Sequence, residues 1–163
     1  MIIKIGDKLP NGTLYEMSEE GPKPVAVADL VKGKRVAIFG LPGAFTPTCS
    51  ALHVPGYVGQ ADQLKAKGVD QIVCLSVNDA FVMGAWGKDQ KVGDKVRMLG
   101  DGSAAFAKAI GLELDLTERG MGMRCQRFSM LVDDGVVKSL NIEAPGKFEV
   151  SDARTMLKQL DTL

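Results

Sequence analysis

The chain has 163 residues and a mass of 17.4 kDa, which is the size of one ordinary domain. It carries 20 lysines and arginines against 20 aspartates and glutamates, so it has no surplus of cations with which to neutralise nucleic-acid phosphates. Hydrophobic residues make up 45% and charged residues 25%, a composition that excludes a disordered chain and indicates a globular one.

The cysteine content and the N-terminal residues indicate in which cellular compartment the protein is expected. Three cysteines are few and odd in number, which predicts free thiols in a reducing environment and excludes a disulfide scaffold. Charges at Lys4, Asp7 and Lys8 interrupt any apolar leader, and the most apolar stretch, residues 36–45, is too short to span a bilayer. We therefore expect a cytoplasmic protein that binds neither membranes nor nucleic acids.

The first half of the chain is predicted to hold an irregular segment, a strand and a helix. Turn residues at Glu20-Gly21-Pro22 favour an irregular start. The apolar run over residues 36–41 is typical of a fully buried strand. Thr46-Pro47 then predicts a helix start, with threonine as the N-cap and proline at the first helical position. This helix should bend near Pro55-Gly56 and end at Gly68.

The second half alternates strands and helices before it closes on a hairpin. The expected segments are strands at 70–77 and 96–99, a helix over 78–88, a helix after Ser103 that closes at Gly111, a hairpin of 128–132 with 136–141, and a helix from Ser151 or Asp152 through Leu160. The hairpin signal is the turn Asp133-Asp134-Gly135. This order predicts a single α/β domain over residues 1–163, with a mixed sheet and helices on both faces.

Cys49 is the leading candidate for chemistry. With Thr46 as the N-cap, it is the third helical residue, where unpaired backbone N–H groups and the helix dipole favour an anion. The anion there can only be a thiolate, the reactive form of cysteine. The Thr46 hydroxyl could donate a hydrogen bond to the sulfur or to a substrate oxygen, and Pro42 could wall the pocket without a competing N–H. The competing interpretation is a small buried residue in a strand-to-helix turn.

Several kinds of thiol site come into question. A Cys/His hydrolase needs a base, and the single histidine, His53, lies one helical turn after Cys49. No third residue is evident that would orient its imidazole, so we expect His53 to pack or to tune the site locally. A zinc site from these two residues and the other cysteines, Cys74 and Cys125, lacks the short paired spacings of zinc modules. Because glycine-rich phosphate-binding motifs are also missing, thiol redox chemistry without a metal or cofactor remains.

The residues before Cys49 resemble a known active-site loop. The run is Pro42-Gly43-Ala44-Phe45-Thr46-Pro47-Thr48-Cys49, which matches the Pro-x-x-x-Thr-x-x-Cys pattern of peroxiredoxins. Its Gly-Ala-Phe-Thr-Pro version is similar to the peroxiredoxin-5 subfamily, also called type II. Further matches follow in order at Phe81–Trp86, Asp101–Ser103 and Arg124–Met130, so the resemblance covers nearly the whole chain. It implies a thioredoxin-like fold and a thiol peroxidase that reduces hydrogen peroxide and alkyl hydroperoxides.

Carried over by position, the resemblance implies a role for each residue of the loop. Cys49 would attack the peroxide and become a sulfenic acid, Thr46 would hold the peroxide and the thiolate, and Pro42 would shield the product. Arg127 would lie against the sulfur, where its permanent charge stabilises the thiolate and the charge that develops on the departing oxygen. Arg124 matches a second arginine, for which we expect a supporting role without direct contact to the sulfur.

The second thiol of the cycle stays open at this point. Cys74 follows Cys49 at the spacing at which many subfamily members carry a second cysteine, yet its predicted strand is apolar, which equally favours an inert core thiol. A disulfide needs Cα atoms within about 7 Å, so the helix start would have to unwind. Cys125 stands where serine is commoner. If one strand ran through residues 125–127, Cys125 would share a face with Arg127 and could lie near the site.

The resemblance also implies partners. Glutathione, glutaredoxin or thioredoxin would return the oxidised cysteine to its reduced form. A homodimer would form through the loops around the site, and Phe45, Phe81 and Trp86 could line either that dimer face or an apolar rim for alkyl groups. The main rival from another class is a non-enzymatic redox sensor, which would share the thiolate but pass its oxidation to a partner protein.

Overall fold

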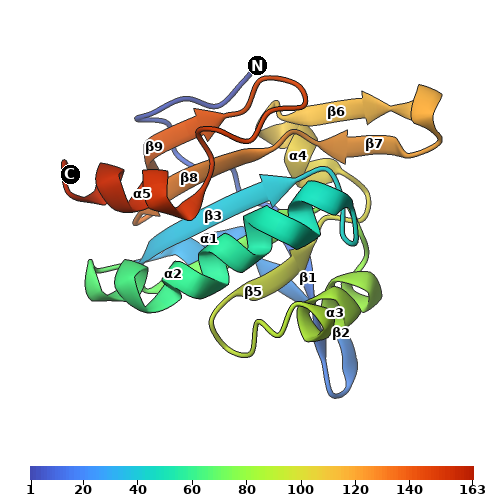
Figure 1. Ribbon diagram of the computed structural model, residues 1–163, viewed down its shortest axis with the longest axis horizontal. Helices are drawn as coiled ribbons and strands as arrows, with labels where there is room; N and C mark the ends of the chain where they lie inside the picture. The colour runs from blue at the N-terminus through green and yellow to red at the C-terminus, as the bar shows by residue number, and fades with distance from the viewer.

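The computed structural model describes residues 1–163, and it contains one large sheet, a short ribbon and helices on both faces of the sheet (Figure 1). The strands are β1 Thr13–Ser18, β2 Gly21–Ala26, β3 Arg35–Leu41, β4 Gln71–Ser76, β5 Arg97–Gly100, β6 Glu113–Leu116, β7 Gly122–Cys125, β8 Phe128–Asp133 and β9 Val136–Ile142. The helices are α1 Val27–Val31, η1 Cys49–His53, α2 Val54–Ala66, α3 Ala80–Asp89, α4 Ala105–Ala109, η2 Thr117–Arg119 and α5 Ala153–Leu160.

The seven-stranded sheet is parallel in its middle and antiparallel at its margins. Its strand order is β2-β1-β5-β4-β3-β8-β9. The strands β3, β4 and β5 pair in parallel, whereas β8 joins β3 and β1 joins β5 in antiparallel fashion. This mixed sheet confirms the predicted α/β class, and no helix is both long and apolar enough to cross a membrane.

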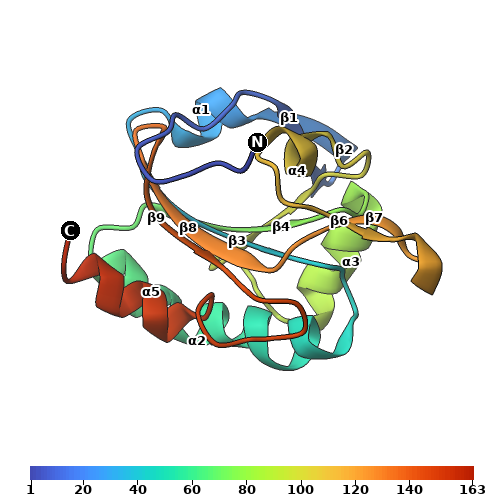
Figure 2. The same ribbon diagram turned by 90° about the horizontal axis from the view of Figure 1, so that it is seen from above.

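The side chains of the central strands enter two separate hydrophobic cores. On β3, Val36 and Ile38 pack in a cluster with α1 and α4, whereas Phe39 and Leu41 pack in a cluster with α2, α3 and α5. Alternate burial on both faces is the pattern of a strand covered by helices on each side. Figure 2 shows the two helical layers on opposite faces of the sheet. Cys49 belongs to the second cluster, on the α2 face.

The prediction of an irregular N-terminal region is wrong for residues 13–31, which form β1, β2 and α1. Two features concealed the hairpin. Its strands are short and largely exposed, and β2 contains Pro22 and Pro24, which the edge of a sheet tolerates because one side of the strand needs no donors. In its tight turn, Gly21 has a φ of 105°, and the Ser18 hydroxyl donates to the Gly21 carbonyl at 2.6 Å.

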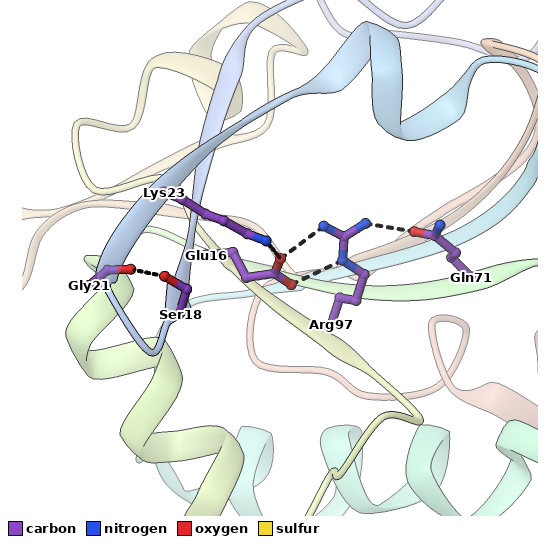
Figure 3. Close-up of polar contacts among 6 residues, drawn as sticks. All are labelled: Glu16, Ser18, Gly21, Lys23, Gln71 and Arg97. Carbon is purple, nitrogen blue, oxygen red and sulfur yellow. Dashed lines mark hydrogen bonds and ion pairs between the residues drawn. The ribbon is translucent and has the colours of Figure 1, made fainter.

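A charged cluster fastens this hairpin to the parallel strands (Figure 3). Arg97 on β5 donates through Nε and Nη2 to the Glu16 carboxylate on β1, at 3.0 and 2.9 Å. Its Nη1 donates to Gln71 Oε1 on β4 at 2.9 Å, and Lys23 Nζ on β2 lies 4.0 Å from the same carboxylate. A bidentate pair is a strong form of ion pair, so side chains from four strands order this edge of the sheet.

Several predicted signals are confirmed. Asp79 and Asp152 cap α3 and α5 by accepting from Val82 N–H at 2.9 Å and from Thr155 N–H at 3.2 Å. Asp134 and Gly135, with φ of 48° and 84°, form the turn between β8 and β9. The ribbon of β6 and β7 was not predicted. Both strands alternate polar residues or glycine with apolar residues, as in Glu-Leu-Asp-Leu, but each is only four residues long, so the pattern was missed.

Candidate active site

The candidate site lies at the carboxyl end of β3, where the chain turns into a helix. The turn occupies residues 42–46 and helical geometry begins at Pro47. The first helical bond runs from Ser50 N–H to the Thr46 carbonyl at 3.0 Å. Cys49 is therefore the third helical residue, as predicted, and its N–H precedes the first intrahelical donor, so it is free to bind an anion.

The helix widens at Cys49. Residues Cys49–His53 form a π-helical turn in which Val54 N–H donates to the Cys49 carbonyl, and α2 then continues as an ordinary α-helix. Pro55 has no N–H to donate to the Ala51 carbonyl, so a regular α-helical ladder is interrupted at this point. The disturbance predicted near Pro55-Gly56 is confirmed, and it lies just before the proline, in the turn that holds both Cys49 and His53.

Two side chains from other elements brace the loop before Cys49. Asn78, which follows β4, accepts a hydrogen bond from Ala44 N–H at 3.0 Å. Arg124 on β7 donates to the Pro42 carbonyl at 3.3 Å. Its guanidinium fills the space beside Gly43, where an added Cβ would lie 2.7 Å from Nη1. The structure thus places Arg124 against the loop backbone and shows no hydrogen bond from it to the sulfur.

Thr46 closes the loop through its hydroxyl, which donates to the Gly43 carbonyl at 2.7 Å. The hydroxyl hydrogen is engaged there, so it donates neither to the sulfur nor to a substrate oxygen, and both donor roles expected from the sequence are wrong for this arrangement. A hydroxyl oxygen has two lone pairs, and these remain able to accept a hydrogen bond from a peroxide O–H. The preceding residue, Phe45, has a φ of 61° and an exposed ring.

Arg127 reaches the sulfur from the segment that leads into β8, a strand next to β3 in the sheet. It directly precedes β8, the antiparallel neighbour of β3. Its Nη2 donates to Cys49 Sγ at 3.1 Å, although the two residues lie 78 positions apart. A guanidinium is charged at every physiological pH, so Arg127 holds a fixed positive charge and an N–H donor against the sulfur.

His53 contacts the other nitrogen of that guanidinium. Arg127 Nη1 lies 2.9 Å from His53 Nδ1 and can only donate, so Nδ1 is the unprotonated acceptor. The imidazole proton is then on Nε2, which donates to the Ser151 carbonyl at 3.1 Å. Burial and the charge of Arg127 lower the pKa of His53 to about 3, so the ring is neutral. Its lone pair faces Arg127, and it is not available as a base for Cys49.

A pocket of about 390 Å³ is lined by Arg127, the residue that contacts the sulfur. Its walls come from the active-site turn and the helix that follows it, from β6, from the segment between β7 and β8, and from the loop between β9 and α5. The lining residues are Pro42, Thr48, Leu52, Leu114, Gln126, Arg127, Glu143, Ala144, Pro145, Gly146, Lys147 and Phe148. The Arg127 guanidinium lies 5.8 Å from the centre of the Phe148 ring, while Cys49 itself is fully buried and does not line the pocket.

Comparisons with known proteins agree with this geometry. Residues 4–157 match the family model described as Redoxin. The chloroplastic Peroxiredoxin-2E of Arabidopsis thaliana is 51% identical over 162 residues, which cover 97% of this chain and 69% of that protein. The chain is a peroxiredoxin.

Solved structures confirm the thioredoxin-like peroxiredoxin fold. The reduced Prx3 of Vibrio vulnificus in complex with hydrogen peroxide is 53% identical, with a TM-score of 0.94 over 98% of this chain and 99% of that one. Peroxiredoxin 5 of Alvinella pompejana is 34% identical, with a TM-score of 0.87 over 99% of both chains. The resemblance to the peroxiredoxin-5 subfamily is therefore confirmed.

Cys74 lies on the same side of the sheet as Cys49. It is on β4 beside Phe39 of β3, and both cysteines belong to one core cluster. Burial raises the pKa of the Cys74 thiol well above its usual value, and the nearby Cys49 acts in the same direction. The thiol is therefore protonated and a weak nucleophile as long as the core stays closed.

The prediction that Cys125 could lie near the site is wrong. Cys125 ends β7 and packs in the cluster on the opposite face of the sheet from Cys49. The expectation required one strand through residues 125–127, but Gln126 and Arg127 lie between β7 and β8, so side chains do not alternate regularly there. Burial also raises the pKa of the Cys125 thiol far above its usual range.

The aromatic residues divide between surface and core. Phe45 and Phe81 are exposed at 54% and 61%. Trp86 is fully buried, and its indole N–H donates to Ser50 Oγ at 3.0 Å, so it cannot belong to a surface rim. It serves instead to attach α3 to the helix start beside Cys49.

Sequence reasoning missed the residues behind His53. The Ser151 carbonyl accepts from His53 and also from the Tyr57 hydroxyl at 2.9 Å. Ser151 in turn donates twice to Glu143, through its N–H at 2.8 Å and its hydroxyl at 2.7 Å. Recognition through a backbone carbonyl leaves no motif, and the only available signal was the helix cap predicted at Ser151 or Asp152.

Proposed function

We propose that this peroxiredoxin reduces hydrogen peroxide and small alkyl hydroperoxides through Cys49 in antioxidant defence. The observation that carries the proposal is the 3.1 Å hydrogen bond from Arg127 to Cys49 Sγ at a helix start. The thiolate donates an electron pair to the terminal peroxide oxygen, an S–O bond forms and the O–O bond breaks. The departing alkoxide or hydroxide takes a proton, which leaves a sulfenic acid and an alcohol or water.

The surrounding groups stabilise this displacement. Arg127 offers fixed, charged donors to the peroxide oxygens, and charge grows on the departing oxygen as the O–O bond breaks, so these donors favour the transition state over the ground state. The Thr46 hydroxyl accepts from the peroxide O–H, because its own hydrogen already binds Gly43. Pro42 borders the pocket and limits access of water to the sulfenic acid. Because Cys49 is buried, the peroxide enters through the pocket that Pro42 and Arg127 line.

An external thiol completes the cycle. Cys74 is buried and protonated, which supports direct attack on the sulfenic acid by glutathione, glutaredoxin or thioredoxin. That attack forms a mixed disulfide and releases water, and a second thiol then displaces Cys49 as its thiolate. Peptide mass spectrometry without reductant, after one equivalent of peroxide, should show oxidised Cys49 and no Cys49–Cys74 link. A Cys49–Cys74 disulfide at high yield would instead make Cys74 the resolving residue.

We further propose a cytoplasmic homodimer. All three thiols are unpaired, which suits a reducing compartment. The exposed rings of Phe45 and Phe81 are suited to an isologous contact beside the active site. Phe81→Asp should convert the dimer to a monomer in light scattering at micromolar concentration, whereas Phe81→Leu should not. A monomeric wild type would contradict this part of the proposal.

The peroxidase proposal is tested by replacing each thiol in turn. Cys49→Ser should abolish peroxide consumption with glutathione and glutaredoxin, because serine has no thiolate. Cys125→Ser is the matched control, since it removes a buried thiol from the other face of the sheet and should leave turnover unchanged. A non-enzymatic sensor would show a single oxidation of Cys49 and no sustained turnover with any thiol, and that result would reject the proposal.

A further inference from the structure

Glu143 is a buried carboxylate that the chemistry above does not use. It follows β9 directly, and only 7% of it is exposed. Its two oxygens accept from Glu149 N–H at 2.9 Å, and Oε2 also accepts from Val150 N–H at 2.9 Å. Ser151 donates two further hydrogen bonds to the same carboxylate. All of these donors belong to the loop that precedes α5.

This arrangement keeps Glu143 ionised. Burial by itself raises the pKa of a carboxyl group, but the hydrogen bonds from Glu149, Ser151 and Val150 outweigh it, and the pKa of Glu143 is lowered. A buried anion with several charge-assisted hydrogen bonds is a strong anchor for backbone. The loop therefore has one orientation in which its amides point at Glu143 and the carbonyl of Ser151 points the other way, towards His53.

The anchored loop reaches Cys49 through two side chains. The Ser151 carbonyl accepts only a protonated nitrogen, so it keeps the His53 proton on Nε2 and leaves the Nδ1 lone pair for Arg127. The same loop carries Phe148, whose ring lies 5.0 Å from that of His53 and 5.8 Å from the Arg127 guanidinium. Both contacts leave Nη2 directed at Cys49 Sγ.

We propose that Glu143 is a positioning residue of this peroxidase, which acts through the Ser151 carbonyl and the His53 tautomer to aim Arg127 at the sulfur. The proposal rests on the peroxidase function proposed above. Without the carboxylate, the loop amides lose their common acceptor, the Ser151 carbonyl can turn away, and the His53 proton is free to move to Nδ1. A protonated Nδ1 cannot accept from Arg127, so the guanidinium loses one of its two fixed contacts.

A double-mutant cycle tests this route. The second-order rate constant for oxidation of Cys49 by hydrogen peroxide is measured by quenched-flow mass spectrometry in Glu143→Gln, in Arg127→Ala and in the double variant. If Glu143 acts through Arg127, Glu143→Gln should lower the rate constant about tenfold alone and less than about twofold in the Arg127→Ala background. An equal loss in both backgrounds, or no loss in either, overturns the proposal. Glu149→Ala removes an exposed carboxylate from the same loop and should leave the rate unchanged.

A second readout does not depend on peroxidase activity. Because the chain has a single histidine, its imidazole ¹⁵N resonances are unambiguous. The wild type should show a neutral ring protonated on Nε2, and Glu143→Gln should shift the Nδ1 and Nε2 signals towards each other as the tautomers mix. Unchanged ¹⁵N signals in Glu143→Gln would overturn the positioning role. This result does not depend on whether the protein reduces peroxides. If Glu143→Gln does not fold, Ser151→Ala removes only the hydroxyl donor to Oε2 and should shift both readouts in the same direction.

Discussion

At the scale of single residues, the site depends on which atom donates and which accepts. Thr46 donates to Gly43 and so presents only lone pairs to a substrate. Thr46→Val keeps the shape of the side chain but removes that acceptor, and it should slow oxidation of Cys49 about 100-fold or more, the usual effect of losing one group that stabilises a transition state. Thr46→Ser retains the hydroxyl and should stay close to wild type. Equal rates in the valine and serine variants, by rapid-quench kinetics, would remove this role.

His53 makes the stability of the protein depend on pH. Its pKa falls from 6.5 to about 3 on folding, so the unfolded chain binds a proton between these values that the folded chain does not. The free energy of unfolding should therefore decrease as the pH falls below 6.5, with a contribution from His53 of about 1 kcal/mol over the first pH unit. Urea titrations should show this extra loss in the wild type and not in His53→Gln. Parallel curves for the two proteins would show that His53 titrates normally.

At the scale of elements, the two helices α3 and α5, which pack beside the site, are each capped by an aspartate. Asp79 accepts from Val82 N–H at the start of α3, the helix that carries Trp86 to Ser50. Asp79→Ala should lower the free energy of unfolding by about 1 kcal/mol. Asp89→Ala removes the same side chain from the exposed last turn of α3, where a negative charge opposes the helix dipole, and should cause no loss. Thermal unfolding by circular dichroism distinguishes the two.

The same scale shows what could be predicted from sequence and what could not. The strand at 36–41, the helix start at Thr46-Pro47 and the hairpin turn at Asp133–Gly135 carry local signals, and all three are present. Arg127 was assigned from a resemblance, and only the pairing of β3 with β8 brings it to Cys49. Glu143 carries no local signal and Ser151 carries only that of a helix cap, because both make their contacts through backbone groups, which leave no sequence motif.

At the scale of the whole molecule, the sheet joins the two halves of the active site. Gly40 on β3 faces Phe128 on β8, one residue after Arg127, and an added Cβ would lie 2.1 Å from the Phe128 ring. Gly40→Ala should therefore destabilise the fold by about 1–3 kcal/mol and slow peroxide oxidation by moving β8. Gly59→Ala, in the middle of α2 with open space around it, should stabilise by about 0.5–1 kcal/mol. Urea unfolding should show changes of opposite sign in the free energy of unfolding of the two variants. A Gly40→Ala variant with unchanged stability and unchanged rate of oxidation would contradict this account of the sheet.

The indole of Trp86 offers one more consequence. It is the only tryptophan of the chain, and its N–H is bonded to the residue that follows the reactive cysteine. Fluorescence excited selectively in tryptophan, and not in the two tyrosines, therefore reports from a single point beside the sulfur without an added dye. Any rearrangement of the helix start that accompanies oxidation or reduction should change this emission. The rate of each step of the cycle can therefore be followed by the fluorescence of Trp86.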